Sequence, residues 1–174
     1  MQTMTATGAE REERAGGRLD DLYRRHAPDA VRLAYLLTGD RALAEDLTQE
    51  AFVRMFGRFR DLRNPDAFGA YLRKTVVNLT RSHFRRVKVE RAYVARERTT
   101  SAATSSQPDV GARDEMWQAL LRLPERQRAA IVLRYYEDLS EAQTADAMRC
   151  PQGTVKSLVS RGLDRLRQEM KRDA

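Results

Sequence analysis

The chain has 174 residues, a third of them charged, with a net charge of +7 and a pI near 10.0, which indicates an anionic partner such as nucleic acid. No apolar run approaches the roughly 20 residues that a membrane-spanning helix requires, and the first residues lack the apolar stretch of a secretory signal. The single cysteine excludes an internal disulfide and favours a reducing cytoplasm.

Charge is distributed unevenly along the chain. Residues 19–53 carry four Lys and Arg against seven Asp and Glu, whereas residues 54–98 carry thirteen against four. The positive excess therefore lies in one block in the middle of the chain, with a smaller excess near the end. An acidic patch beside a basic block can receive a basic partner surface while the basic block holds nucleic acid.

The first forty residues predict an arm followed by a helix. Residues 1–17 are small and polar, and they are expected to form a disordered arm. Apolar spacing then predicts a helix from Leu19 to Leu37 that Pro28 bends or breaks. His26 lies on the apolar side and is expected to be a packed core residue rather than a metal ligand.

A second helix is expected from Asp40, which follows a Thr-Gly turn and can act as the N-cap, to about Phe59. Its outer face exposes Asp46, Gln49 and Glu50 at the i, i+3 and i+4 spacing. A solvated acidic face is the simpler interpretation, and a docking site for a basic partner surface is the functional one.

After a loop at residues 60–65, a third helix is expected from a cap at Asn64 or Asp66 to Phe84. Its polar side is strongly basic and alternates with aromatic residues, which are Tyr71, His83, Phe84 and Tyr93. This combination is typical of single-strand nucleic-acid binding, because positive charges contact phosphates and rings stack on bases. A basic helix that is merely solvated is the alternative.

Residues 99–112 are rich in Ser, Thr and Ala and have no apolar periodicity, so they indicate a flexible linker. No strand-like alternation occurs anywhere. The chain is therefore expected to be all-α, with two small helical domains at residues 18–91 and 114–174 and a linker at residues 92–113.

The second domain begins with a short helix that ends at Pro124, and this proline also opens the next helix. Trp117 in the short helix is expected to lie in the core. Cys150 falls in a later turn, where a half-buried apolar role is expected for it.

The last third of the chain has the pattern of a helix-turn-helix. Ser140 followed by Gln143 forms a capping box and predicts a short helix through Met148. Residues 149–153, which include a proline and a glycine, break this helix, and residues 154–167 or beyond form the next one. In a helix-turn-helix the second helix enters the DNA major groove. An ordinary αα-hairpin is the alternative.

This second helix is expected to have two distinct faces. The apolar face consists of Val155, Val159, Leu163, Leu166 and Met170, with Gly162 between them. The opposite face carries Thr154, Lys156, Ser157, Ser160, Arg161 and Asp164. Its small hydroxyls and basic side chains suit contacts with base edges and phosphates.

No pattern for catalysis or metal binding is present. The sequence has no glycine-rich phosphate loop, no H-x-x-x-H or C-x-x-C pair and no nucleophile elbow. Two distant histidines and one cysteine do not support a catalytic proposal. The sequence therefore predicts no enzyme activity, no cofactor and no metal site.

Three segments, in this order, resemble the bacterial RNA polymerase sigma factors of the extracytoplasmic-function (ECF) group. Residues 44–52 (AEDLTQEAF) are similar to the family's polymerase-docking segment. Residues 64–68 (NPDAF), with the basic helix after them, are similar to the segment that reads the minus-ten promoter element. Residues 123–128 (LPERQR) and 153–157 (GTVKS) resemble the domain that reads the minus-thirty-five element. Residues 36–40 (LLTGD) are similar to the actinobacterial branch in particular.

The resemblance implies a promoter-specificity subunit of RNA polymerase. The β′ clamp coiled coil would be contacted by Asp46, Gln49 and Glu50, and the β flap by the apolar surface of the second domain. The melted non-template strand of the minus-ten element would be held by Arg63, Asn64, Asn78, Arg81, Ser82, Arg85 and Arg86. The minus-thirty-five major groove would be contacted by Thr154, Lys156, Ser157, Ser160 and Arg161. The partners would be core RNA polymerase and promoter DNA, with an anti-sigma factor as a further candidate; the free protein would be a cytoplasmic monomer without membrane insertion.

Three residues depart from the family pattern. Tyr71 stands where a tryptophan is common, which affects stacking at the melted junction. Leu158 stands where the recognition helix often has a basic residue, so one DNA contact would be missing. Thr144 stands where isoleucine is usual, which would loosen the packing of the first helix of the motif.

Two other functions account for parts of the sequence. An ordinary helix-turn-helix regulator would need a dimer face that places two recognition helices about 34 Å apart, and no heptad pattern supplies one. A decoy that binds polymerase without directing initiation would use Asp46 and Glu50 but would leave the minus-ten block of residues 64–86 without a role.

Overall fold

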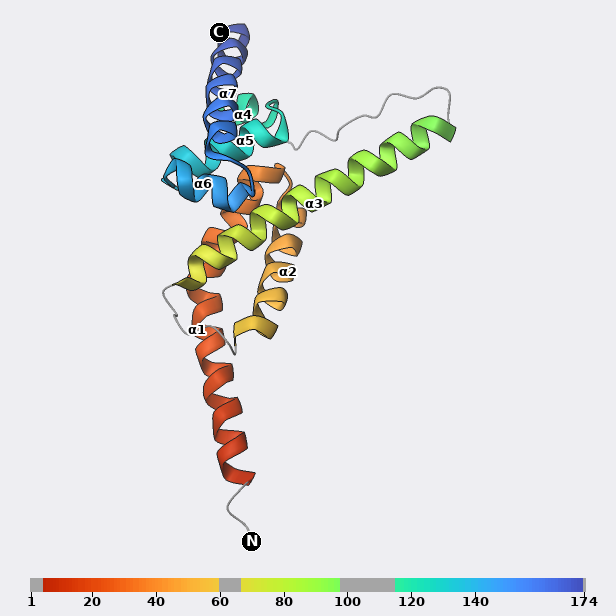
Figure 1. Ribbon diagram of the computed structural model, residues 1–174. Coiled ribbons are helices and arrows are strands. Elements are labelled where there is room, and N and C mark those ends of the chain that lie inside the picture. The colour runs from red at the N-terminus through yellow and green to blue at the C-terminus, as the bar shows by residue number, and fades with distance from the viewer. Residues whose placement is uncertain (1–4, 60–66, 98–114, 174) are drawn as a thin grey trace.

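The computed structural model describes the backbone of residues 5–59, 67–97 and 115–173, and the side chains of residues 20–55, 67–93 and 115–171. This part of the chain is helical, without strands (Figure 1). The expected all-α fold is therefore confirmed. The predicted loop at residues 60–65, the predicted cap at Asn64 or Asp66 and the predicted linker at residues 99–112 lie outside the described residues.

The first region consists of α1 (Thr5–Thr38), α2 (Arg41–Phe59) and α3 (Phe68–Glu97), which pack against one another (Figure 1). The expected turn between α1 and α2 is confirmed. Gly39 has a φ of +76°, which glycine adopts without strain. The Asp40 side chain accepts a hydrogen bond of 3.0 Å from the backbone N–H of Leu43, as an N-cap does.

Helix α1 differs from two expectations. It begins at Thr5, inside the segment expected to be a disordered arm, and it continues through Pro28. The early residues are rich in Ala, Glu and Arg, which are strong helix formers. Pro28 removes one helical hydrogen bond, and its ring is exposed to solvent. Ala27 and Ala30 beside it are buried in the core. Packing on both sides of the proline therefore maintains the helix.

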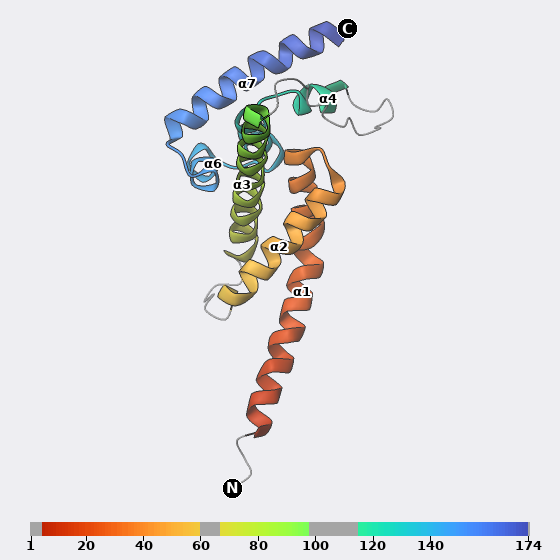
Figure 2. The ribbon, with the colours of Figure 1, turned by 90° about the vertical axis from the view of Figure 1, so that its right-hand side faces the viewer.

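The second region contains α4 (Glu115–Leu121), α5 (Glu125–Ile131), η2 (Val132–Tyr136), α6 (Glu141–Met148) and α7 (Gln152–Asp173). The expected break at Pro124 is confirmed. The sequence did not predict the π-helical turn η2, in which the Glu137 N–H donates to the Val132 carbonyl at 3.0 Å. Figure 2 shows α7 lying across the other helices of this region.

The predicted capping box at the start of α6 is present in both halves. The Gln143 N–H donates to the Ser140 hydroxyl at 3.1 Å, and the Ser140 N–H donates to the Gln143 side chain at 2.8 Å. At the other end of α6, Arg149 adopts the left-handed conformation with a φ of +50°, which closes the helix and directs the chain into α7. These two ends produce the tight helix-turn-helix that the sequence predicted.

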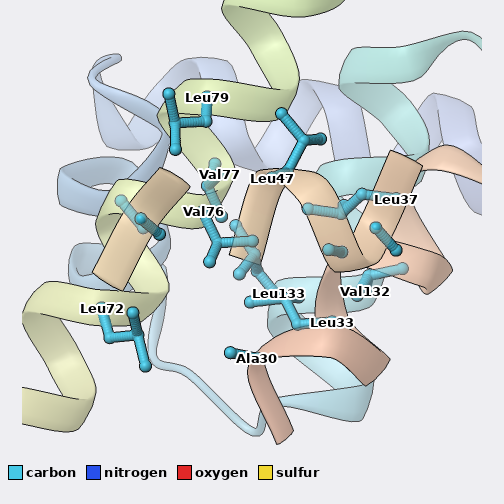
Figure 3. Packing of buried hydrophobic residues seen from close by; sticks show 14 of the residues in the cluster. Ala30, Leu33, Leu37, Leu47, Leu72, Val76, Val77, Leu79, Val132 and Leu133 are labelled. Atoms are coloured by element: carbon cyan, nitrogen blue, oxygen red, sulfur yellow. The ribbon is translucent and has the colours of Figure 1, made fainter. Parts of the chain in front are cut away.

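Buried apolar residues of both regions form one continuous cluster (Figure 3). Leu33 of α1 and Val76 of α3 are almost fully buried beside Val132 and Leu133 of η2. Trp117 is buried as expected, and it stacks on Tyr35 of α1 with a centroid distance of 4.9 Å. The two regions are therefore packed on each other. The sequence predicted two domains joined by a flexible linker, but it did not predict that they pack together.

A second, smaller cluster holds α7 on α4 and α5. It contains Leu166, Ile131 and Leu123, with Leu163 and Met170 half-buried against it. Gly162 permits this approach, because a Cβ there would lie only 2.7 Å from the Ile131 side chain. The predicted apolar face of α7 is thus confirmed.

Candidate polymerase and nucleic-acid interfaces

The outer face of α2 presents Asp46, Gln49 and Glu50 to solvent, on the side opposite to the buried Leu47 and Ala51. Glu50 forms an exposed ion pair of 2.6 Å with Arg54 one turn later. Such exposed pairs contribute little to stability. The three predicted docking residues therefore lie together on one rigid, accessible helix face.

The outer face of α7 presents Lys156, Ser160 and Arg161 to solvent, and Thr154 and Ser157 are half-buried on the same side. The Ser157 hydroxyl donates to the Thr154 carbonyl at 2.9 Å, and the Arg161 side chain donates to the Ser157 carbonyl at 3.1 Å. Contacts within the helix thus orient these side chains. All five predicted residues lie on the side of α7 that is turned away from its apolar face.

Two of the departures from the family pattern are core residues in this structure. Leu158 is buried and belongs to the large apolar cluster. The structure thus gives Leu158 a packing role, and the expectation that one DNA contact is missing at this position stays a prediction. Thr144 is fully buried, and among the described atoms its hydroxyl has no hydrogen-bond partner. An unpaired buried hydroxyl is destabilising, which agrees with the expected weaker packing.

The predicted minus-ten residues on α3 divide into two sets. Ser82, Arg85 and Arg86 are exposed. Asn78 is half-buried and donates its side-chain amide to the Lys74 carbonyl at 2.7 Å, and Arg81, which is itself exposed, donates to the Met148 carbonyl of α6 at 3.2 Å. Arg63 and Asn64 lie outside the described residues. The second region thus occupies part of the surface that was assigned to promoter DNA.

Two ion pairs between the regions were not predicted. Arg73 of α3 pairs with Glu137 at 2.5 Å, and Lys74 pairs with Asp146 of α6 at 2.7 Å. The partners are 64 and 72 residues apart in sequence. No local spacing in the sequence could have revealed these contacts.

The aromatic residues of α3 are not equally available for stacking on bases. Tyr71 and Tyr93 are more than half exposed, at 53% and 65%. Phe84 is half-buried and lies 5.8 Å from the guanidinium of Arg128 on α5. Burial lowers the pKa of Arg128, and its side chain donates to the Leu121 carbonyl at 2.9 Å. Phe84 is thus engaged between the two regions, whereas both tyrosines face solvent.

His26 is half-buried with its ring 5.2 Å from that of Phe68 and close to Gly69. Burial, followed by the charge of Arg25, lowers its pKa. Within the described residues, no group of three His, Cys, Asp or Glu side chains could hold a metal ion. The same part of the chain contains no helix that is long and apolar enough to cross a membrane.

Comparisons with known proteins agree with this organisation. Residues 22–89 match the family Sigma-70 region 2, and residues 113–166 match Sigma-70, region 4. The chain is 35% identical over 150 residues to the RNA polymerase sigma-E factor of Streptomyces avermitilis, covering 85% of this chain and 83% of that protein. It is 33% identical over 154 residues to the ECF RNA polymerase sigma factor SigE of Mycolicibacterium smegmatis, covering 85% of this chain and 60% of that protein.

Two solved structures share the fold. The sigma factor RpoE in complex with the anti-sigma factor NepR from Bartonella quintana matches with a TM-score of 0.68 at 24% identity, over 89% of this chain and 98% of that one. CnrH in complex with the cytosolic domain of CnrY matches with a TM-score of 0.61 at 21% identity, over 90% and 89%. The chain therefore belongs to the ECF group of sigma-70 RNA polymerase sigma factors, which bind core RNA polymerase, recognise promoters and are not enzymes.

Proposed function

We propose that the chain divides its sigma function among three surfaces. The outer face of α2 docks on the β′ clamp coiled coil of core polymerase, the outer face of α7 reads the minus-thirty-five element, and α3 with the loop before it captures the melted minus-ten strand. In this proposal the domains are residues 18–91 and 114–174, and the free protein is a monomer.

The docking role of α2 is supported by charge and exposure. Asp46 and Glu50 are one turn apart and exposed, and their helix is anchored from behind by buried Leu47 and Ala51. A partner helix with basic side chains fits such a face, because opposite charges accelerate and orient association. A DNA-binding regulator that acts without polymerase would have no use for this face.

The observation that best supports promoter reading is the geometry of α6 and α7. The capping box at Ser140 and the left-handed turn at Arg149 fix α6, and α7 then presents Lys156 and Arg161 outward. A helix of this kind enters the major groove, where its basic and hydroxyl side chains contact phosphates and base edges.

The minus-ten role needs binding energy rather than covalent chemistry. Unstacking a base costs on the order of a few kcal/mol, and stacking it on an aromatic side chain returns about 1–3 kcal/mol. Exposed Tyr71 and the exposed cations Arg85 and Arg86 support this role on α3. Arg63, Asn64, Asn78, Arg81 and Ser82 complete the proposed strand-binding set.

An anti-sigma factor is part of the proposal as a regulatory partner. Of the two solved structures that share this fold, RpoE was determined with the anti-sigma factor NepR and CnrH with the cytosolic domain of CnrY. The β flap is proposed as a second polymerase contact, made by the apolar surface of the second region.

The experiment is run-off transcription with core polymerase on a pool of genomic promoter fragments, with and without the chain. We expect new discrete transcripts, whose start sites also reveal the promoter sequence. Stable binding to core without transcripts would favour a decoy, and failure to bind core would favour an ordinary DNA-binding regulator.

A further inference from the structure

The basic side of α3 that faces the second region is held by three polar contacts. Arg73 and Lys74 pair with Glu137 and Asp146, at 2.5 and 2.7 Å. Two turns further along, the side chain of Arg81 donates to the last carbonyl of α6, where the helix dipole also favours a cation. Two carboxylates and the C-terminus of α6 thus contact three cations of α3, the helix that is proposed to bind DNA.

Apolar residues lie directly beneath these contacts. Val77 of α3 is on the same side as the three cations and belongs to one buried cluster with Met148 of α6 and Leu133 of η2. Figure 3 shows Val77 and Leu133 within this cluster. The ion pairs therefore lie over a packed interface between the two regions.

The closed arrangement covers some functional surfaces and leaves others open. It engages Arg81 through the Met148 carbonyl, and it buries Val132 and Leu133 in the cluster that both regions share. It leaves Asp46 and Glu50 of α2 exposed. Core polymerase can therefore reach the docking face of the closed chain, while Arg73, Lys74 and Arg81 of α3 are already engaged by groups of the second region.

We propose that Glu137 and Asp146 form an acidic latch, which occupies the basic side of α3 in place of DNA phosphates and keeps the free chain closed until core polymerase separates the two regions. The proposal rests on the assignment of α3 to minus-ten DNA. It sets an order of events in which docking through α2 comes first, opening follows, and strand capture comes last.

The two pairs of the latch are unequal. The Glu137 side chain is 14% exposed and that of Arg73 is 30% exposed, whereas the Asp146 side chain is 70% exposed. Water screens the exposed pair more strongly, so the pair of Arg73 with Glu137 contributes most of the stabilisation that the latch provides. The turn after Glu137 is fixed by Asp138, whose φ is +49°.

Fluorescence of the single tryptophan can report whether the two regions are packed together. This residue, Trp117 of α4, is buried against Tyr35 of α1 across the same interface. Separation of the regions exposes this indole to water. Its emission should then shift to longer wavelength, and acrylamide should quench it faster.

The first test neutralises the latch with Glu137→Gln and Asp146→Asn. We expect faster acrylamide quenching of Trp117 and about three- to tenfold tighter binding of a random-sequence single-stranded oligonucleotide, since a larger share of the chain is open. The control is Asp20→Asn with Glu45→Gln, which removes the same charge from exposed pairs with Arg24 and Arg41. Quenching equal to that of the control would overturn the latch.

The second test reverses one pair. Glu137→Arg should open the chain by repulsion from Arg73, and Arg73→Glu combined with Glu137→Arg should restore slow quenching. Circular dichroism establishes that each variant keeps its helices. Failure of the swapped pair to restore closure would overturn the role of this contact. Faster quenching without tighter DNA binding would instead contradict the assignment of α3 to DNA, and with it the proposed function.

Discussion

The two basic helix faces of this sigma factor differ in what lies against them. On α7, Lys156 and Arg161 are exposed, and their contacts come from within the second region. On α3, Arg73 and Arg81 are held by groups of the second region. Residue spacing predicts which side chains share a helix face, but contacts between distant segments decide whether that face is free. The outer face of α2 is acidic and exposed, and like the basic face of α7 it is not covered by the other region.

The largest expected effect is on the open acidic face. Asp46→Ala with Glu50→Ala should weaken core polymerase binding about 100-fold or more, because truncated hot-spot residues each cost about 2 kcal/mol or more. The measurement is a quantitative pull-down with core enzyme. Asp20→Ala with Asp21→Ala removes the same charge from exposed positions of α1 and should bind as the wild type does. Undiminished binding of the first variant would show that docking uses another surface.

The next effect is on the open basic face. In the holoenzyme, Lys156→Ala with Arg161→Ala should reduce crosslinking to the minus-thirty-five element about tenfold or more, because each base or phosphate contact contributes on the order of 1–3 kcal/mol. Arg165→Ala with Arg167→Ala, which lie further along α7, is the matched control. Unchanged crosslinking in the first variant would mean that a different face reads the upstream DNA.

Two buried threonines provide a comparison of packing in the two regions. The Thr48 hydroxyl donates to the Ala44 carbonyl at 2.8 Å, whereas the Thr144 hydroxyl has no partner among the described atoms. Thr144→Val should therefore stabilise the protein by about 1 kcal/mol, which raises the melting temperature by about 2–4 °C. Thr48→Val loses a hydrogen bond and should not stabilise. Equal effects of the two substitutions in thermal melts would contradict this account.

The smallest expected effect concerns His26 in the first region. Its pKa is lowered in the folded state, chiefly by burial, so the unfolded chain takes up a proton more readily. The stability contribution of His26 is thus complete above the unfolded pKa of about 6.5 and is lost as the pH falls toward the folded pKa. The urea midpoint should drop between about pH 7.5 and about pH 5.5, and His26→Gln should reduce that drop. An equal drop in the wild type and in His26→Gln would refute the assignment.

Local sequence rules predicted most of the second region. The capping box at Ser140, the break at Pro124 and the apolar face of α7 all depend on residues within a few positions of one another, and all three are present. The N-cap at Asp40 follows the same logic. These features are set by short-range hydrogen bonding and helical periodicity, which a single sequence displays directly.

Other features depend on long-range packing, and the sequence did not reveal them. Pro28 remains inside α1 because both neighbouring turns are buried. Leu158 lies in the large buried cluster, whereas the family resemblance drew attention to it only as a missing DNA contact. The ion pair of Arg73 with Glu137 joins residues 64 apart. Family resemblance supplied the roles of the α2 and α7 faces, but it did not supply the closed arrangement.

The most direct test of the difference between α3 and α7 is to lock the latch. In a Cys150→Ser background, Lys74→Cys and Asp146→Cys would be bridged by a short, reductively cleavable bismaleimide, and run-off transcription would be measured before and after cleavage. The account predicts that the bridged protein binds core polymerase but yields no promoter-dependent transcript, and that cleavage restores transcription to the level of the same variant before bridging. Full transcription by the bridged protein would contradict the account, because the covered side of α3 would then not need to open.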